Sequence, residues 1–421
     1  MMQRLESIVD HARRFSPYYA HHLRALPARG WSLSDLPLIE AASFWRMERG
    51  LAHWPVLTGA LEDAVVFKTG GTAGPGKLSV FSREEWQGFV SAFGRGMASR
   101  LRAGDRVANL FFAGDLYASF LFIHGALQSS PVPVTEYPFA GLIEPGALAQ
   151  SVESFGISVL AGLPVQMLRL AEWLEANGRT LPQVTTLLYG GEGLFAEQTV
   201  HLARVFPNAH CASIGYAGVD SGLLGASTAD CRFGEHRVFD DEACVELIDE
   251  DSGEVIETPG RAGRLVVTSL TRYLMPMIRY PVGDLAEWVE VQGTPKRKFL
   301  LRGRCGEGYR VRIGVFTLFP DEIGREIQRR FGACVWQMLI GGAGEPCERV
   351  TLCVVRHGQV GDTECLESAL GAMYPPERGF ELPIRVRWCS PGELVTHPRS
   401  GKLPRVVDLR GAAERAAAVS P

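Results

Sequence analysis

Lysine is scarce in this sequence, which has five lysines against 38 arginines, and neither sign of charge dominates. The formal net charge of −4 leaves no basic surplus of the kind that binds nucleic acids or anionic membranes. No apolar run reaches the roughly 18 residues that a membrane-spanning helix needs, and residues 118–127 predict a buried helix instead. The N-terminal residues carry charges throughout, unlike a secretory signal. We therefore expect a cytoplasmic protein without nucleic-acid or membrane partners.

Paired cysteines are absent as well. The nine cysteines are scattered, odd in number and include no C-x-x-C pair, which is typical of reduced thiols and not of a disulfide framework or a zinc site. His236 with Cys231 and Cys244 is one conceivable set of metal ligands, but zinc sites usually contain closely spaced ligand pairs. We expect these three to be ordinary side chains of a loop region.

The pattern of apolar runs predicts an α/β fold. The first 60 or so residues look helical, and their aromatic side chains are expected to pack onto the main body. From Val65 onward short apolar runs alternate with helical patterns, which predicts a buried, mainly parallel sheet. From Gly234 the pattern is that of antiparallel strands, with a turn at residues 251–253. Residues 293–308, rich in glycine and basic residues, predict a linker.

The last part of the chain predicts a small α+β domain. Residues 319–332 have Pro320 at the first helical position, acidic residues in the first turn and Gly332 after the end, as helices often do. Residues 348–356 and 384–390 predict strands, and the tail 411–421 is weakly specified. We expect two domains, residues 1–303 and 304–421.

A glycine-rich segment, T-G-G-T-A-G-P-G-K at residues 69–77, allows three interpretations. A P-loop NTPase needs a hydroxyl residue after the lysine, but Leu78 follows Lys77, and Pro75 removes a backbone donor. A plain flexible turn is the second interpretation. The third is a mobile flap over a triphosphate, in which glycines admit phosphates closely, Thr69 and Thr72 donate hydroxyls and Lys77 adds positive charge.

Five further segments follow this loop in a fixed order, and with them the chain resembles the adenylate-forming enzymes. This superfamily contains acyl-CoA and aryl-CoA ligases, peptide-synthetase adenylation domains and luciferases. Residues 69–77 are similar to its phosphate loop, and Y-G-G-E-G-L at 189–194 to the segment that walls the adenine. The other segments resemble the aromatic-plus-acid motif, the Tyr-x-x-Gly-Asp motif, the hinge with the start of the lid, and the C-terminal lysine motif: residues 213–222, 277–288, 301–323 and 397–409.

The resemblance covers about residues 67–409 and is nearest to the phenylacetate-CoA ligase branch, on residues 265–284 and 400–409. Within that branch, residues 109–127 resemble relatives linked to phenazine antibiotic biosynthesis. The resemblance implies a mobile C-terminal lid and ATP-dependent conversion of a carboxylic acid to an acyl-adenylate with release of pyrophosphate. Thioester formation with CoA, or with a carrier protein acting in trans, would follow. ATP and Mg²⁺ are the implied cofactors, with CoA as co-substrate.

The resemblance also implies roles for single residues. Lys402 would be catalytic, because a compact ammonium can bridge the substrate carboxylate and the nucleotide as charge develops. Tyr216 would stack on the adenine, and Asp284 and Arg304 would reach the ribose. The implied phosphate ligands are Thr69, Gly70, Gly71, Thr72, Gly74 and Lys77. The implied adenine and ribose contacts are Gly190, Gly191, Glu192, Tyr216, Asp284 and Arg304.

Two positions depart from the family pattern. The acid that coordinates Mg²⁺ is usually a glutamate after threonine or serine, but the chain has Val219 and Asp220 there. Asp220 is the expected metal ligand, with a water bridging the shorter side chain. At the hinge, Gly306 replaces the usual aspartate or lysine and would still let the lid swing. A non-catalytic relative that binds a nucleotide or an acyl ligand is therefore the alternative.

The acid substrate is expected to lie among residues 113–117, 137–141 and 213–215, whose aromatic side chains favour an aryl acid. Asp115 could pair with an amino or hydroxyl substituent of the substrate, or cap a helix, and the sequence around it favours the cap. An oligomer is compatible with the sequence. The expected pocket residues are Asp115, Tyr137, Ile214 and Gly215.

Overall fold

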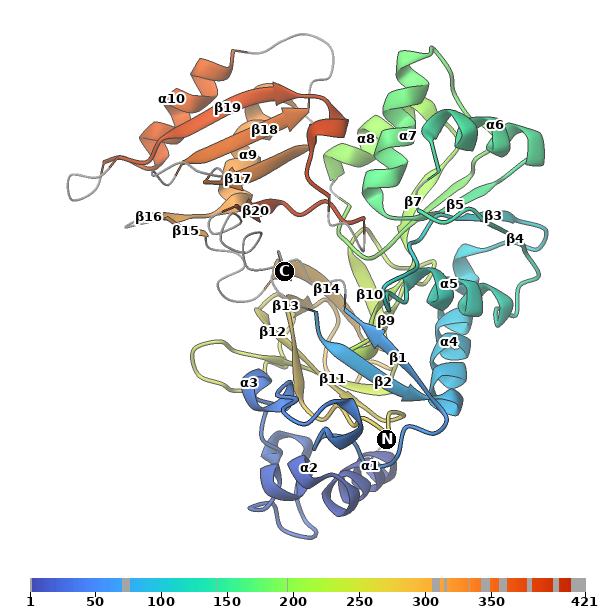
Figure 1. The fold of residues 1–421 in the computed structure, drawn as a ribbon, viewed down its shortest axis with the longest axis vertical. Helices are drawn as coiled ribbons and strands as arrows, with labels where there is room; N and C mark the ends of the chain where they lie inside the picture. Colours follow the sequence, from blue (N-terminus) through green and yellow to red (C-terminus); the bar gives the residue numbers. More distant parts are fainter. Residues whose placement is uncertain are drawn as a thin grey trace, which may run out of the picture.

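The computed structural model describes residues 2–69, 76–141, 143–194, 196–304, 311–313, 316–332, 334–341, 349–355, 362–376, 381–396 and 401–409. Figure 1 shows the N-terminal helices at one end of the molecule and an antiparallel sheet in the middle. The parallel sheet and the C-terminal sheet lie at the other end. This arrangement is the predicted α/β fold. Within the described ranges, no helix has both the length and the apolar character needed to cross a membrane.

The N-terminal segment is helical, as predicted, and packs onto the antiparallel sheet. Its first helix buries Leu5, Ile8, Val9 and Ala12, which lie on one face at helical spacing. Tyr19 is fully buried, and its hydroxyl donates to the carbonyl of Pro276 over 2.8 Å, so the predicted aromatic packing is confirmed. The elements are α1 (Met2–Phe15), α2 (Pro17–His22), η1 (Leu33–Asp35), α3 (Ala41–Phe44) and η2 (Leu51–His53).

The next sheet is parallel throughout, with the order β4-β3-β5-β6-β7. Apolar side chains cover both of its faces, which explains the continuous apolar runs in the sequence. The strands are β3 (Arg106–Asn109), β4 (Thr135–Pro138), β5 (Val159–Gly162), β6 (Thr186–Tyr189) and β7 (His210–Ser213). One face packs against α4 (Arg83–Met97) and α5 (Ser119–Gln128), and the other against α6 (Pro145–Phe155), α7 (Pro164–Ala176) and α8 (Ala196–Val205). A short helix, η3 (Ala98–Arg100), follows α4.

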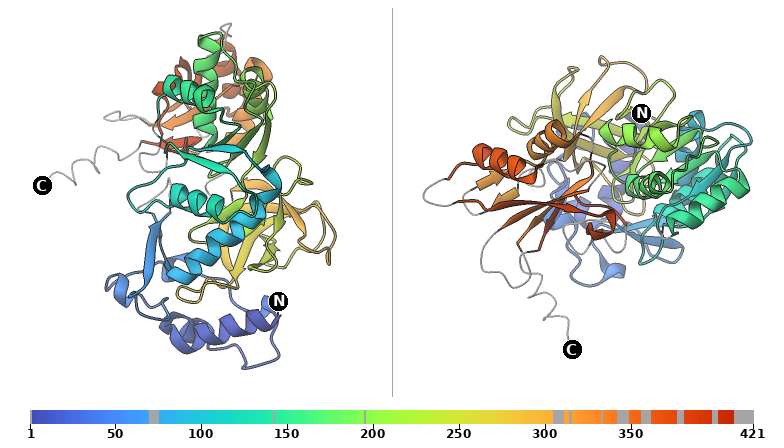
Figure 2. Two further views of the ribbon diagram at one scale, coloured as in Figure 1. Left: turned by 90° about the vertical axis from the view of Figure 1, so that its right-hand side faces the viewer. Right: turned by 90° about the horizontal axis from the view of Figure 1, so that it is seen from above.

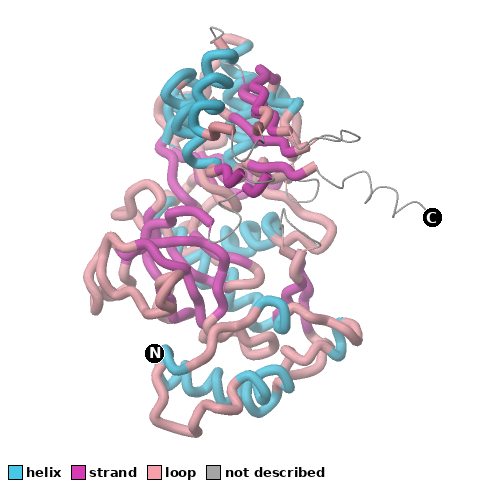
Figure 3. Tube along the Cα trace, turned by 90° about the vertical axis from the view of Figure 1, so that its left-hand side faces the viewer, coloured by secondary structure: helices cyan, strands magenta, loops and turns pink. Residues whose placement is uncertain are grey.

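The central sheet is antiparallel, as the sequence from Gly234 predicts, with the order β11-β12-β13-β14-β10-β9-β8. Figure 3 shows its strands as one block between the N-terminal helices and the upper part of the molecule. The predicted turn is present: Gly253 has a φ of 73° and its amide donates to the Asp249 carbonyl. The strands are β8 (Tyr216–Gly218), β9 (Gly222–Ala226), β10 (Glu235–Val238), β11 (Ala243–Ile248), β12 (Ala262–Ser269), β13 (Tyr280–Trp288) and β14 (Lys298–Arg304).

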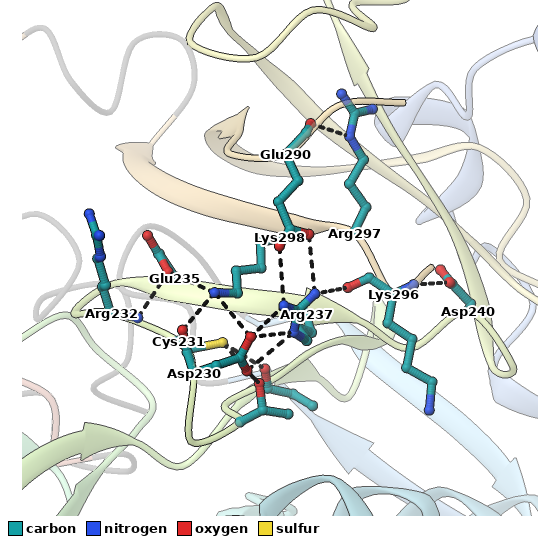
Figure 4. A network of polar contacts seen from close by, with 12 residues as sticks. Asp230, Cys231, Arg232, Glu235, Arg237, Asp240, Glu290, Lys296, Arg297 and Lys298 are labelled. Carbon is teal, nitrogen blue, oxygen red and sulfur yellow. Dashed lines mark hydrogen bonds and ion pairs between the residues drawn. The ribbon is translucent and has the colours of Figure 1, made fainter. Parts of the chain in front are cut away.

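The prediction of a linker at residues 293–308 is wrong at residues 298–304, because these form β14, which lies between β13 and β10 inside this sheet, and residues 305–308 are outside the described part of the structure. Phe299 is fully buried, and basic residues flank it along the strand. Figure 4 shows ion pairs between β14 and its neighbours: Lys298 of β14 pairs with Asp230, and Arg237 of the adjacent β10 pairs with Asp230 and Glu290. Lys298, one of the basic residues that suggested a linker, is therefore part of a paired strand.

Two short strands flank the glycine-rich segment. They are β1 (Ala64–Lys68) and β2 (Leu78–Ser82), which pair antiparallel with Lys68 opposite Leu78. The described ends of the segment are joined further: the amide of Thr69 donates to the carbonyl of Lys77, and the amide of Lys77 donates to the Thr69 hydroxyl, both over 2.9 Å. The strands thus fix where the segment starts and ends.

The C-terminal sheet has the order β19-β18-β17-β20. One face packs against α9 and α10, and buried residues of the other face, Cys353, Val355 and Cys389, join the core under α6, α7 and α8. Figure 2 shows the same neighbourhood from above. The predicted helix and both predicted strands are confirmed; residues 410–421 lie outside the described ranges. The elements are β15 (Val311–Ile313), β16 (Phe316–Leu318), α9 (Pro320–Phe331), β17 (Trp336–Ile340), β18 (Val350–Val355), α10 (Thr363–Met373), β19 (Ile384–Cys389), η5 (Pro391–Glu393) and β20 (Val406–Asp408).

Candidate active site

The candidate site lies beyond the carboxyl ends of β6 and β7, the edge at which open α/β sheets bind ligands. Gly190 follows β6 and Ile214 follows β7. A Cβ added at Gly190 would lie 2.6 Å from Ile214 Cγ2, and the Ile214 amide donates to the Tyr189 carbonyl over 2.8 Å. The two segments therefore form one closely packed wall, at which only glycine fits at position 190.

Lys402, from the C-terminal part of the chain, reaches this wall. Gly191 has a φ of 77°, and a Cβ there would lie 2.8 Å from Leu163 Cδ2 and 3.5 Å from Lys402 Cε. The lysine side chain thus lies directly over the Gly191 backbone. The preceding Gly401, with a φ of 66°, packs onto the ring of Phe112, which a Cβ would approach to 2.2 Å. Glycines on both sides of the contact allow the lysine loop to dock.

Glu192 holds this docked loop through its carboxylate. One oxygen accepts a hydrogen bond from the Leu403 amide over 3.1 Å, and the other accepts from the Val165 amide at the start of α7 over 3.4 Å. Burial raises the pKa of Glu192 to about 7, and the nearby Lys402 charge and the two amides act against this rise. Glu192 therefore joins the parallel sheet region to the C-terminal loop.

Tyr216 and Asp284 are brought together, although they are distant in sequence. The Tyr216 hydroxyl donates to the Asp284 carboxylate. The Tyr216 ring lies 5.9 Å from the ring of His236 and 6.1 Å from that of Phe299, in centroid distance. Asp284 on β13 is the register partner of Arg304 on β14, whose side chain is outside the described part of the structure. The predicted adenine contact Tyr216 and the predicted ribose contact Asp284 are thus joined by their side chains, although their strands β8 and β13 are not neighbours in the sheet.

His236 and Cys231, named above as conceivable metal ligands, contact hydroxyl groups in the structure. The Nε2 of His236 lies 2.9 Å from the Ser213 hydroxyl, and burial lowers its pKa to about 4, so it is neutral near pH 7. Cys231 contacts the Thr228 hydroxyl. Among the described residues, no group of three or more His, Cys, Asp or Glu side chains could hold a metal ion. The expectation of a loop was wrong for His236 and Cys244, which lie on β10 and β11.

For the predicted phosphate loop, residues 69–77, the structure describes only Thr69, Gly76 and Lys77. Four of its predicted ligands lie outside the described residues: Gly70, Gly71, Thr72 and Gly74. The Lys77 ammonium donates to the Tyr280 hydroxyl over 2.6 Å and lies 3.7 Å from Asp220 Oδ2. The Tyr280 hydroxyl in turn donates to Asp220 Oδ2 over 2.9 Å. The predicted phosphate lysine and the predicted metal ligand are therefore neighbours.

A magnesium ion carried by a nucleotide fits this carboxylate. Asp220 supplies a hard oxygen ligand, and its side chain is 18% exposed, so it remains accessible. Mg²⁺ is usually held by one or two carboxylates, waters and substrate phosphates, and it does not need a cage of protein ligands. The hinge glycine of the sequence analysis, Gly306, is outside the described residues.

Arg272 is a residue of the site that the sequence did not reveal. Its guanidinium is fully buried and donates to the carbonyls of Val219, Asp220 and Val80 and to the Ser79 hydroxyl, over 2.8 to 3.0 Å. Burial lowers its pKa to about 10. Arg272 thus ties β2, which follows the phosphate loop, to the turn that carries Asp220. Among 38 arginines, no local pattern marks this one.

The predicted substrate residues are only partly assembled. Ile214 is buried at the wall, and Gly215, with a φ of 130°, packs against the Phe93 ring. Tyr137 stacks on Phe155 of α6, with ring centroids 5.4 Å apart, on the sheet face opposite that of Ile214. Asp115 is exposed with a φ of 45°. Its predicted role as a helix cap is wrong, because α5 begins four residues later, at Ser119, with Ala118 as its N-cap.

Comparison with known proteins agrees with this picture. No model of a known protein family matches the chain. It is 26% identical over 296 residues to a phenylacetate-coenzyme A ligase of Thermus thermophilus, a match that covers 67% of this chain and 64% of that protein. It is also 26% identical over 340 residues to a phenylacetate-coenzyme A ligase of Aromatoleum evansii, covering 76% of this chain and 73% of the relative. The chain therefore spans slightly less than two thirds of the first relative.

Solved structures share the fold. A structure of 2-hydroxyisobutyryl-CoA ligase with 2-HIB-AMP has a TM-score of 0.76 at 18% identity and covers 99% of this chain and 90% of that chain. ATP-bound MatB from Rhodopseudomonas palustris has a TM-score of 0.55 at 17% identity, covering 88% of this chain and 69% of that chain. The sequence similarity and the shared fold thus agree with the resemblance to the adenylate-forming acyl-CoA ligases that the order of the motifs indicates.

Proposed function

We propose that this protein activates a carboxylic acid with ATP and then transfers the acyl group to the thiol of CoA. The observation that carries this proposal is the docking of Lys402 over Gly191, with the Leu403 amide bound to Glu192. It brings the cation of the C-terminal lysine motif to the edge of the sheet where a nucleotide would bind. Division into domains of residues 1–303 and 304–421, with a lid that moves between the two steps, is part of the proposal.

In the first step, a carboxylate oxygen of the acid attacks the α-phosphorus of ATP, and the bond to pyrophosphate breaks. Both reactants are anionic, so the residues must hold them together and neutralise charge as it shifts. Lys402 would bridge the carboxylate and the α-phosphate, because its ammonium has three donors and a compact charge. Lys77 would act on the outer phosphates from the end of β1–β2.

The nucleoside would be held by the hydrogen-bonded side chains of Tyr216 and Asp284. Tyr216 offers a flat ring for the adenine, and Asp284 offers carboxylate oxygens to the ribose hydroxyls. Asp220 would hold Mg²⁺, which supplies charge neutralisation to the phosphates when bound. In the second step the thiolate of CoA attacks the acyl carbon and AMP leaves with the electron pair of the broken bond.

An aryl acid remains the predicted substrate class, supported by Phe111 and Phe112 near the wall at Gly190 and Gly401. A carrier protein as thiol acceptor and the link to phenazine biosynthesis also stay predictions.

The test is pyrophosphate release from ATP and Mg²⁺ across a panel of aryl and short aliphatic acids, first without thiol. We expect release that depends on the acid and falls about 10²- to 10³-fold in Lys402→Ala, since it loses one electrostatic contact to the transition state. Lys296→Ala, which removes an exposed lysine with no predicted role in the site, is the matched control and should keep full activity. CoA and carrier proteins are then compared as acceptors.

ATP binding without acid-dependent release across the panel would favour the alternative, a non-catalytic relative that binds a nucleotide or an acyl ligand. Release of orthophosphate without any acid would instead indicate an NTPase.

A further inference from the structure

The ammonium of Lys77 lies in a small cage built by three separate parts of the chain. Its Nζ is 5.3 Å from the ring centroid of Trp45 and 5.3 Å from that of Tyr280. The Tyr280 hydroxyl accepts its hydrogen bond, and Asp220 supplies the negative charge at 3.7 Å. Cations are attracted to the faces of Trp and Tyr rings, most strongly to Trp. Trp45 belongs to the N-terminal helical segment, for which no role in the site was expected.

The walls of the cage are themselves fixed. Tyr280 is 1% exposed, and its hydroxyl is bound to Asp220. The Trp45 ring contacts the rings of Phe44, Trp54 and Tyr280, at centroid distances of 4.9, 5.7 and 6.0 Å. Because these walls are already fixed by packing, holding Lys77 orders only the lysine side chain itself.

This arrangement conflicts with the state that the proposed function requires. Lys77 neutralises Asp220, yet in the nucleotide complex Lys77 is to act on phosphates and Asp220 on Mg²⁺. A lysine ammonium and a magnesium ion beside one carboxylate would repel each other. Movement of the Lys77 ammonium from Asp220 to the phosphates would relieve this repulsion when the nucleotide binds.

We propose that Trp45 is a positioning residue that, with Tyr280, holds Lys77 against Asp220 in the nucleotide-free protein, and that binding of Mg²⁺ and ATP draws the ammonium off the Trp45 ring. The inference rests on the proposed function in so far as it takes ATP as the ligand. The opposite possibility is that the cage presents Lys77 in its ligand-bound position. The two possibilities predict different effects of Trp45 on ATP affinity. A contact that exists only in the nucleotide-free protein weakens ATP binding, whereas a contact that is kept in the complex does not.

The experiment measures the dissociation constant of ATP with Mg²⁺ by calorimetry, with no acid present. Trp45→Leu removes the ring face, and we expect binding to tighten about two- to fivefold, the factor that corresponds to an exposed cation–π contact. Trp45→Phe keeps a weaker ring and should lie between the wild type and Trp45→Leu. Trp31→Phe changes another buried tryptophan of the N-terminal segment that is no part of the cage, and it should leave the constant unchanged. Unchanged or weaker binding in Trp45→Leu would overturn the proposal.

A double-mutant cycle keeps the test independent of nucleotide binding. In the ligand-free protein, Trp45→Leu and Lys77→Met should be coupled in the free energy of unfolding, because each removes the same contact. In the Lys77→Met background, Trp45→Leu should no longer change ATP affinity. If the wild type binds no ATP, the proposed function fails, while the cycle in the free protein still decides whether Trp45 holds Lys77. Additive effects in that cycle would refute the cage.

Discussion

Replacement of Arg272 by methionine should loosen the junction between the phosphate-loop strand and the turn that carries Asp220. The arginine is fully buried and donates four hydrogen bonds, to three carbonyls and one hydroxyl. Its guanidinium also lies 4.1 Å above the ring centroid of Phe81. Methionine keeps an apolar stem in contact with that ring but supplies no donor.

The expected loss of stability depends on which carbonyl acceptors keep a hydrogen bond after the substitution. The Val219 carbonyl also accepts from the Ser79 hydroxyl and stays satisfied, whereas the carbonyls of Asp220 and Val80 lose their bond from this side chain. A buried acceptor left without its partner costs about 1–3 kcal/mol. Removing the buried charge offsets part of this, because burial already lowers the pKa of Arg272 to about 10. We expect the free energy of unfolding to fall by about 2–4 kcal/mol.

The assay combines urea unfolding with native-state hydrogen exchange. Exchange should speed up most at residues 79–81 and 219–221, which the arginine joins. Arg46→Met removes an arginine whose side chain is 73% exposed and is the control, with an expected change within about 0.5 kcal/mol. A free energy of unfolding for Arg272→Met within about 0.5 kcal/mol of the wild type would refute the reasoning, as would exchange that rises evenly over the whole chain.

Three further substitutions test the site. In the folded protein the pKa of Glu192 is about 7, above its ordinary value of 4.5, so the folded state holds this proton more tightly than the unfolded state and the protein loses stability as the pH rises from 4.5 to 7. Glu192→Gln should flatten this decrease of the urea midpoint with pH. An unchanged pH dependence would contradict the assignment. The pKa of His236, about 4, lies below its ordinary 6.5, so stability is lost as pH falls from 6.5 to 4, and His236→Leu should abolish this loss, measured in the same way. Gly401→Ala would place a Cβ atom inside the Phe112 ring and should prevent the lysine loop from docking. We expect pyrophosphate release to fall at least about tenfold while the circular dichroism spectrum stays unchanged. Full activity would show that the loop does not pack against Phe112 during the reaction.

The sequence by itself determined the elements and the order of the motifs. Apolar runs covered on both faces predicted the parallel strands, and the cap residues Pro320 and Gly332 predicted α9, because these signals act over a few neighbouring residues. The rarity of lysine directed attention to Lys402, which the structure places at the wall beside Gly191. The same local reading was wrong at residues 298–304, where the partners of the strand, β10 and β13, come from elsewhere in the chain.

Only the tertiary structure decided which residues meet at the site. No motif predicted the contacts that Arg272, Trp45 and Tyr280 make, since an arginine or an aromatic residue has the same neighbours in sequence whether it serves the core or the site. The bond of Glu192 to Leu403 spans 211 positions, and that of Arg272 to Ser79 spans 193. Contacts of this kind arise when sheets and loops pack, and their partners are set by the whole fold. The sequence therefore specified the chemistry that was available, and packing specified which of these groups act on one another.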